Sequence, residues 1–250
     1  AIIGTQTITE LLALGGVSAI FWTLFFQTTV KYVFITLRAD NKGEGGIFSL
    51  YTLIRKYRKW LLIPAILGGS FLLADSIITP PISVSSAMEG LRPHFPAIPI
   101  IPLVISIIVL LFVLQRKGTS FLGKLFGPIM MIWFTMIAVL GISELAENLS
   151  VLKALNPYYA YKMLTQHPGG FWLLGGVFLC TTGAEALYSD LGHCGRKNIQ
   201  ISWLYVKICL ILCYFGQAAW LLKHIGTHLT DVSPFFGLVP SWFIFPAIAI

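Results

Sequence analysis

Charged side chains are scarce in this sequence, and their scarcity excludes an ordinary soluble protein. Only 11% of the 250 residues are Asp, Glu, Lys or Arg, whereas a soluble domain carries about 25%. Hydrophobic residues make up 56% of the chain, and its mean hydropathy is +0.82. Most of the chain is therefore expected to lie inside a lipid bilayer.

Common catalytic and cofactor motifs are also lacking. The four cysteines form no CxxC pair and three of them lie in apolar stretches, so neither a disulfide nor a zinc site is indicated. The sequence contains no HExxH, no GxSxG and no Gly-Lys-Ser/Thr phosphate loop. No resident cofactor is therefore expected.

An initiator methionine and a basic leader are absent as well, and both ends of the chain are apolar. We therefore expect residues 1–250 to form one transmembrane domain that is an internal piece of a longer polytopic protein. Because about 20 apolar residues span a bilayer as a helix, the pattern predicts an all-α membrane protein with seven segments. These are Ala13–Leu37, Trp60–Gly90, Ile98–Gln115, Phe121–Gly141, Gly169–Gly192, Ile199–Leu222 and Phe236–Ile250.

The cations of the connecting loops are distributed unevenly between the two sides of the membrane. Eleven lie on one side: Arg38, Lys42, Arg55, Lys56, Arg58, Lys59, Arg116, Lys117, Lys124, Arg196 and Lys197. Only four lie on the other: Arg92, Lys153, Lys162 and Lys223. The positive-inside rule then places loops 38–59, 116–124 and 193–198 in the cytoplasm. Topology thus accounts for the net charge of +7, and no nucleic-acid partner is implied.

The longest cytoplasmic loop, residues 41–59, contains an amphipathic stretch. At roughly helical spacing it places Phe48, Tyr51, Leu53, Ile54 and Tyr57, followed by cations. This pattern predicts a short helix lying on the inner face of the membrane. A plain charged loop is the alternative.

Polar residues share one face of the second predicted segment. At about 100° per residue, an arc of about 120° holds Asp75, Thr79, Ser83, Ser86 and Glu89. Pro80 has no N–H, so we expect an interruption that frees backbone carbonyls one turn earlier. Oxygen-lined walls suit hard cations, and a charge at the bilayer centre costs about 2.5–3.5 kcal/mol, so it is rarely without function. The alternative is a helix-packing face in which Asp75 pairs with a lysine.

The fifth predicted segment repeats this arrangement. In CTTGAEALYSDLGHCG, residues 180–195, another such arc holds Thr181, Thr182, Glu185, Tyr188 and Ser189. Gly183 is a position where the helix could unwind. Since Glu185 and Asp75 fall at similar depths in their segments, two midplane acids beside helix interruptions indicate a transporter substrate site.

Asp190 and His193 follow nearer the cytoplasmic end of this segment. His193 could relay protons, or it could be an ordinary loop residue beside Gly-Cys-Gly. Together with Glu89, these two residues are secondary candidates for the site.

Several blocks carry a resemblance to a known family. RADNKGEGGIFSLY, GGSFLLADSIITPPISVSSAMEGL, GKLFGPIMMIWF, LKALNPYYA and TTGAEALYSDLGHCG, followed by YFGQAAWLLK, occur in order over nearly the whole chain. They closely resemble the Kup/HAK/KT potassium uptake family. The resemblance implies a plasma-membrane secondary transporter of the amino acid–polyamine–organocation superfamily. Its fold would be a LeuT-type inverted repeat of five plus five helices with discontinuous first and sixth helices.

The resemblance also implies roles for individual residues. The family motif G-[DE]-x-x-x-T-P matches residues 74–80, which assigns its acid to Asp75, and a second motif matches residues 182–195 and assigns Glu185 to the sixth helix. Ala74, Pro81 and Cys194 depart from the usual pattern and could alter local helix geometry. The family's first-helix motif, G-D-I-G-T-S-P-L-Y, has no counterpart in this chain.

The expected mechanism is proton-coupled potassium uptake. Oxygens of Asp75, Thr79, Thr182 and Tyr188 would bind K⁺, and Glu185 or Asp75 would carry the proton, with H⁺ and K⁺ as the transported partners. The chain would act in the lipid bilayer. The sequence does not determine the oligomeric state, and it is compatible with a homodimer.

Three alternatives remain at this stage. A potassium channel would need a filter such as TVGYG, which is absent. A membrane enzyme could use His193 and Asp190, but no supporting motif accompanies them. A transporter of another small cation or of an amino acid on the same fold is the stronger alternative.

Overall fold

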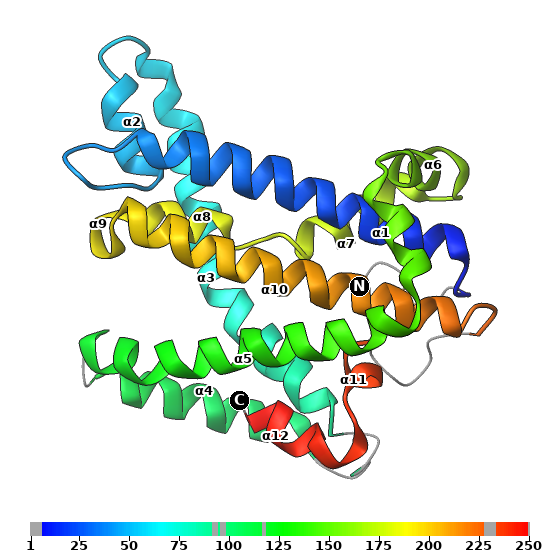
Figure 1. Ribbon diagram of the computed structural model, residues 1–250. Coiled ribbons are helices and arrows are strands. Elements are labelled where there is room, and N and C mark those ends of the chain that lie inside the picture. Colours follow the sequence, from blue (N-terminus) through cyan, green and yellow to red (C-terminus); the bar gives the residue numbers. More distant parts are fainter. Residues whose placement is uncertain (1–6, 92–94, 96–98, 117–118, 228–233, 250) are drawn as a thin grey trace.

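The computed structural model describes residues 7–91, 95, 99–116, 119–227 and 234–249, and these residues are helix, turn or loop apart from isolated bridge residues such as the pair Asn41–Glu44 (Figure 1). The all-α prediction is confirmed. Within these residues four helices are long and apolar enough to cross a membrane: Glu10–Arg38, Lys59–Met88, Phe126–Glu147 and Arg196–Lys223. Shorter apolar helices at Ile100–Leu114 and Gly170–Leu179 fall within two further predicted segments. The number of segments, seven, stays a prediction.

The first long helix combines three kinds of winding. It comprises α1 (Glu10–Thr23), a π-helical stretch η1 (Leu24–Ile35) and a 3₁₀ turn η2 (Thr36–Arg38). Thr9 caps its start by accepting the N–H of Leu12 at 3.2 Å. Within or just after η1, the hydroxyls of Thr29 and Thr36 each donate to the carbonyl five residues earlier, at 3.1 and 2.7 Å. These bonds follow the spacing of π winding, which often marks functional sites.

Helix α1 forms the centre of a bundle because residues 12–20 are buried around its whole circumference. It packs against η4 (Leu149–Leu155), α6 (Tyr158–Gln166), α7 (Gly170–Leu179) and α10 (Arg196–Lys223). At Gly15 a β-carbon would lie 2.4 Å from Cβ of Met163, so only glycine permits this approach.

Helix α5 (Thr119–Glu147) runs beside α10, and the two backbones come close at two glycines. A β-carbon on Gly216 would lie 2.5 Å from Cα of Gly141. Beyond this crossing, the ammonium of Lys223 contacts one carboxylate oxygen each of Glu144 and Glu147 at 2.6 Å.

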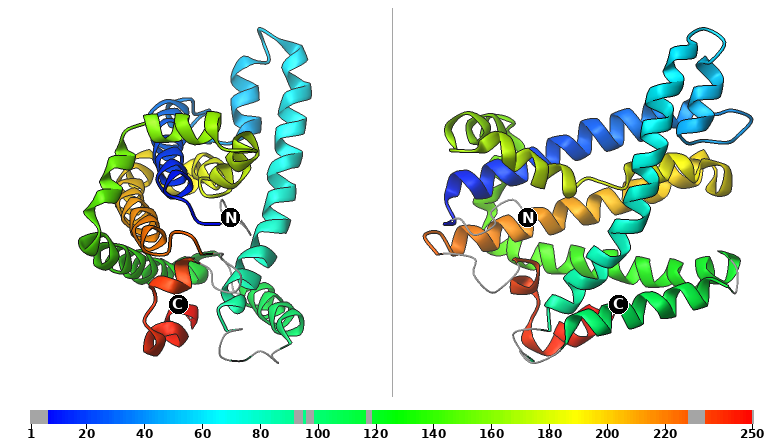
Figure 2. Two further views of the ribbon diagram at one scale, coloured as in Figure 1. Left: turned by 90° about the vertical axis from the view of Figure 1, so that its right-hand side faces the viewer. Right: turned by 180° about the vertical axis from the view of Figure 1, so that it is seen from behind.

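Helix α3 (Leu62–Glu89) runs across the direction of α1, α5 and α10 and lies beside the bundle (Figure 2). It packs against α2 (Ile47–Ile54) and α4 (Ile100–Gln115), and most of its side chains are exposed. The helix continues through Pro80 and Pro81, so the predicted interruption there is wrong. Two prolines remove two N–H donors, yet the residues on both sides of them remain helical.

The fifth predicted segment is interrupted as expected. Helix α7 ends at Leu179, and α8 (Ala184–Ser189) begins after the turn 180–183, where Gly183 has φ +97°. A short α9 (Leu191–Cys194) then leads into α10, and the described chain ends with α11 (Pro234–Leu238), a 3₁₀ turn at Ser241–Phe243 and α12 (Ile244–Ala249). The short helix predicted in loop 41–59 is present as α2; whether it lies on a membrane stays a prediction.

Candidate functional site

The interruption between α7 and α8 leaves backbone oxygen atoms without hydrogen-bond donors. The side chains of Thr181 and Thr182 turn back to donate to the carbonyls of Phe178 and Leu179, both at 3.0 Å. The backbone carbonyls of Thr181 and Thr182 accept no hydrogen bond from any described residue. Carbonyls without donors are the groups that replace water around a dehydrated alkali cation.

Glu185 stands directly after this turn. Its Oε2 accepts the N–H of Gly183 at 3.1 Å, so the carboxylate folds back over the break. The helix that carries Glu185, α8, packs against η1. Helix α8 thus carries the carboxylate of Glu185 in its first turn, directly after the unbonded carbonyls of Thr181 and Thr182. This segment combines a formal negative charge with neutral oxygen ligands.

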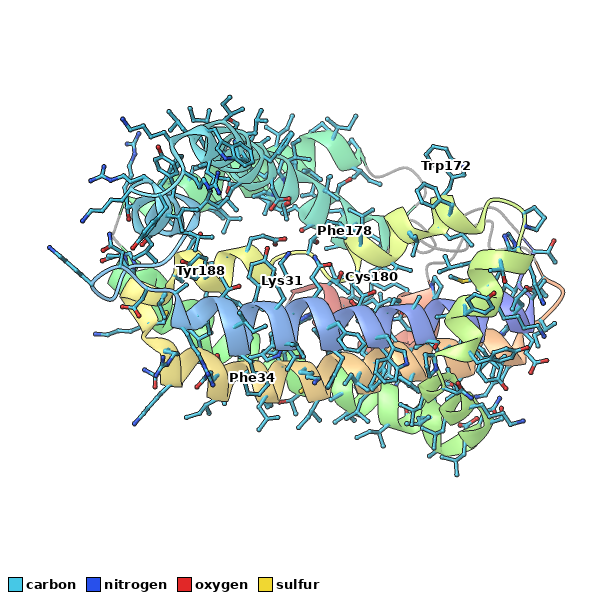
Figure 3. The ribbon with its side chains drawn as sticks, turned by 90° about the horizontal axis from the view of Figure 1, so that it is seen from above. Lys31, Phe34, Trp172, Phe178, Cys180 and Tyr188 are labelled. Atoms are coloured by element: carbon cyan, nitrogen blue, oxygen red, sulfur yellow. The ribbon has the colours of Figure 1, made fainter. Side chains whose placement is uncertain are left out.

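The π-helical stretch η1 forms the opposite side of this region, since it packs against α8. Figure 3 shows Lys31 on the side of the helix that faces the α7–α8 segment, between Tyr188 and Cys180. The buried hydroxyl of Thr29 accepts from Nε1 of Trp203 at 3.1 Å, whereas the hydroxyl of Thr28, equally buried, has no hydrogen-bond partner among the described residues. The sequence analysis did not identify η1 as part of the site, because nothing in its composition signals π winding.

Tyr188 is buried, and its hydroxyl donates to the backbone carbonyl of Ala39 at 2.5 Å. This bond attaches the start of loop 38–59 to α8. Further along the loop, a β-carbon on Gly45 would lie 1.9 Å from the carbonyl oxygen of Tyr188. The glycines of the GEGG stretch were the available signal for this close approach.

The polar face of α3 is present but stands apart from the broken segment. The hydroxyl of Thr79 donates to Oδ1 of Asp75 at 2.8 Å, one helical turn away, and both side chains are exposed. The prolines leave the carbonyls of Ser76 and Ile77 without helical donors. Within the described residues α3 packs mainly against α2 and α4, whereas α8 packs against η1 and α9. The structure therefore contains the polar face of α3, with Asp75 and Thr79, and the α7–α8 break, with Thr182 and Glu185, as two separate oxygen-rich walls and does not bring them together.

The secondary candidates are Asp190, His193 and Glu89. Asp190 and His193 are exposed, and the hydrogen bonds that they form with described residues are of the backbone, among them the bond from the His193 N–H to the Asp190 carbonyl at 3.1 Å. Glu89 ends α3, and its side chain lies outside the described residues.

Comparison with known proteins assigns the chain to a family. A family profile described as the K⁺ potassium transporter integral membrane domain matches residues 2–250. The probable potassium transport system protein Kup of Flavobacterium psychrophilum is 61% identical over 249 residues, which cover 97% of this chain and 38% of that protein. The corresponding protein of Cytophaga hutchinsonii is also 61% identical, over 98% of this chain and 38% of its own length.

More distant relatives agree with this assignment. The probable potassium transport system protein Kup of Clostridium perfringens strain SM101 is 54% identical, over 96% of this chain and 39% of that protein. No solved structure matches the chain. The chain spans about 38% of the length of the curated relatives from Flavobacterium psychrophilum and Cytophaga hutchinsonii. With a match over residues 2–250, it belongs to the Kup family of potassium transporters, a family of integral membrane transport proteins and not of enzymes.

Proposed function

We propose that this chain is part of a potassium uptake protein in which K⁺ is held between α3 and the α7–α8 break. The observation that carries the proposal is the pair of unbonded carbonyls at Thr181 and Thr182 beside the carboxylate of Glu185. Asp75 and Thr79 supply a second oxygen wall of the same character. Dehydration of K⁺ is offset by several such oxygens acting together.

Potassium entry is coupled to protons in this proposal. Glu185 carries the proton, because its carboxylate folds over the turn and its helix packs against η1, and Asp75 faces the cation. The two walls meet during the transport cycle, in which one repeat of a LeuT-type 5+5 arrangement rocks against the other. The hydroxyl of Tyr188, engaged with Ala39, positions the inner half-helix. The ligand set comprises Asp75, Thr79, the hydroxyl of Thr182 and the backbone carbonyls of Thr181 and Thr182.

The membrane orientation follows from the charged loops. Loops 38–59, 116–124 and 193–198 face the cytoplasm, and uptake proceeds across the plasma membrane toward them. Labelling of single cysteines placed in loop 38–59 should succeed only from the cytoplasmic side, and labelling from outside would reverse the topology. The names of the relatives, which describe potassium transport systems, support K⁺ as the substrate.

The proposal is tested by rubidium uptake into liposomes that contain the full-length protein, with and without an imposed pH gradient. Glu185→Gln keeps the shape and hydrogen bonding of the side chain but cannot ionise. We expect this variant to bind rubidium but to lose accumulation driven by the pH gradient. Asp75→Asn should instead weaken rubidium affinity first, because its charge faces the ion.

Three results would contradict these roles. Accumulation by Glu185→Gln against a gradient would remove the proton from this residue. Loss of pH dependence in Asp75→Asn alone would exchange the two roles. Normal transport by both variants would make the acids structural.

A further inference from the structure

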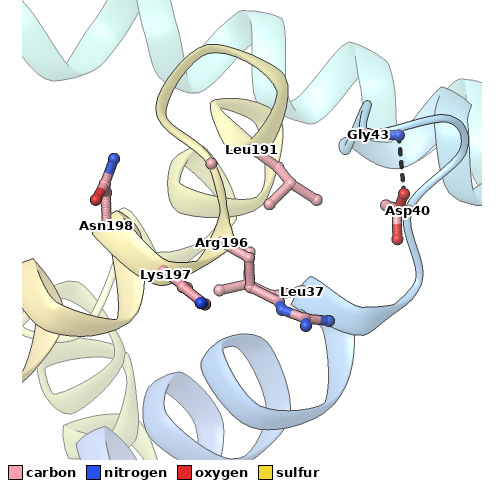
Figure 4. A pocket seen from close by; sticks show the side chains of 8 residues that line it. Leu37, Asp40, Gly43, Leu191, Arg196, Lys197 and Asn198 are labelled. Carbon is pink, nitrogen blue, oxygen red and sulfur yellow. Dashed lines mark hydrogen bonds between the residues drawn. The ribbon is translucent and has the colours of Figure 1, made fainter.

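A pocket of about 470 Å³ opens between the end of the first long helix and the start of α10 (Figure 4). Leu37 and Leu191 give it an apolar part, and Asp40 and Gly43 line it from the cytoplasmic loop. Arg196 and Lys197, the first two residues of α10, line it from the other element. The potassium site described above uses none of these residues.

The charges of the pocket are separated by sign. Arg196 and Lys197 are exposed, and neither forms an ion pair with any described residue. Oδ2 of Asp40 accepts the N–H of Gly43 at 2.8 Å, as the dashed line in Figure 4 shows, and the other carboxylate oxygen has no partner in the described chain. Asp40 also lies beyond ion-pair distance of both cations. The pocket therefore offers two cations from one element and one carboxylate oxygen from another.

The position of the pocket along the helices places it at a membrane surface. One candidate span ends at Arg38, next to Leu37, and another begins at Arg196. Both ends lie on the side to which the cationic loops assign the cytoplasm. Lipid phosphate groups lie at this level, and basic pockets between helix ends on the cytoplasmic side bind phospholipid head groups.

We propose that this pocket binds the head group of phosphatidylethanolamine from the inner leaflet. The phosphate contacts Arg196 and Lys197, with the planar guanidinium suited to two parallel hydrogen bonds. The primary ammonium donates to the free oxygen of Asp40, and the glycerol end contacts Leu37 and Leu191. A purely anionic head group would leave Asp40 facing like charge, and a choline head group has no N–H to donate.

Native mass spectrometry of the full-length protein in detergent tests this proposal. Phosphatidylethanolamine, phosphatidylglycerol and phosphatidylcholine with identical acyl chains are added at equal concentration. We expect several-fold higher retention of the ethanolamine lipid, and loss of this excess in the double variant Arg196→Gln with Lys197→Gln. The matched control is Lys56→Gln with Lys59→Gln, which removes two exposed cations of loop 38–59 that lie outside the pocket. This control should behave as the parent.

Asp40→Asn tests the amine contact separately, because its amide oxygen still accepts the N–H of Gly43. This variant should retain ethanolamine and glycerol lipids equally. Equal retention of all three lipids by the parent, or an equal loss in the control variant, would overturn the proposal. Preference for phosphatidylglycerol, or stronger retention of every lipid in Asp40→Asn, would overturn the amine contact. Displacement of the lipid by equimolar water-soluble O-phosphoethanolamine would make the ligand a free phosphate ester and not a lipid.

Discussion

The two helices that carry the candidate ion ligands respond differently to residues that disfavour helix. Helix α3 holds two adjacent prolines and remains continuous, whereas the α7–α8 segment unwinds at a turn that ends with Gly183. Proline removes a donor but its own φ is helical, so the chain can continue when the neighbouring dihedrals are maintained. Gly183 has φ +97°, a value from which no right-handed helix can continue. In both segments carbonyl oxygens lose their helical hydrogen bonds. In α3 the prolines lack the N–H donors, and in α7–α8 the chain changes direction.

The largest effect is expected from Gly183→Ala. The space around Gly183 is open, so the cost of the new methyl group is conformational, about 1–2 kcal/mol for the left-handed backbone. If a helix formed across the turn, the carbonyls of Thr181 and Thr182 would accept helical hydrogen bonds and would no longer be free to bind the ion. We expect rubidium uptake to be lost while the protein still inserts into the membrane.

Gly175→Ala is the matched control for this change. Gly175 also has open space around it, but it lies in the regular helix α7, where alanine is favoured over glycine by about 1 kcal/mol. Uptake by this variant should equal that of the parent. Parental uptake by Gly183→Ala as well would show that the break does not serve transport.

A smaller effect is expected from Pro80→Ala. Alanine restores an N–H that bonds the carbonyl of Ser76, and it relieves a cost of about 3 kcal/mol for proline inside a helix. If that carbonyl serves the ion, the Michaelis constant for rubidium should rise several-fold in a protein that is at least as stable. Pro128→Ala, which makes the same change inside α5, should leave the constant unaltered. An unchanged constant in both variants would show that the carbonyls of α3 are not ligands.

The smallest effect is expected from Tyr188→Phe. The change removes the hydrogen bond to Ala39, a contribution of about 0.5–1.5 kcal/mol, and leaves the buried ring in place. Amide hydrogen exchange over residues 39–46 should become faster by up to about tenfold, with little change in rubidium affinity. Tyr158→Phe, at an exposed tyrosine, should change neither. A several-fold loss of affinity with unchanged exchange would instead identify the hydroxyl as an ion ligand.

Sequence reasoning predicted those features that local composition controls. Apolar runs located the long helices, and Gly183 marked the break because only a residue without a side chain favours its backbone conformation. The Asp75–Thr79 contact followed from helical spacing alone. The interruption at Pro80 was predicted wrongly because a missing N–H was equated with a change of direction.

Features that depend on distant parts of the chain were not predictable in this way. The π-helical stretch η1 packs against α8 and α10, and the attachment of loop 38–59 to Tyr188 joins residues 149 positions apart. Neither leaves a periodic trace in the sequence. Depth in a helix placed Asp75 and Glu185 at one level, but depth does not determine lateral distance, and the structure keeps their helices apart.

Potassium affinity of Thr79→Val, Thr182→Val and the double variant tests the central claim most directly, namely that one ion contacts both walls. Valine removes one oxygen with little change of volume at each site. Isothermal titration of the full-length protein should show that each single change weakens K⁺ binding. The loss of binding free energy in the double variant should differ from the sum of the two single losses by at least about 0.5 kcal/mol. Affinities equal to the parent in both single variants, or two losses that add within error, would contradict a single ion shared by α3 and the α7–α8 break.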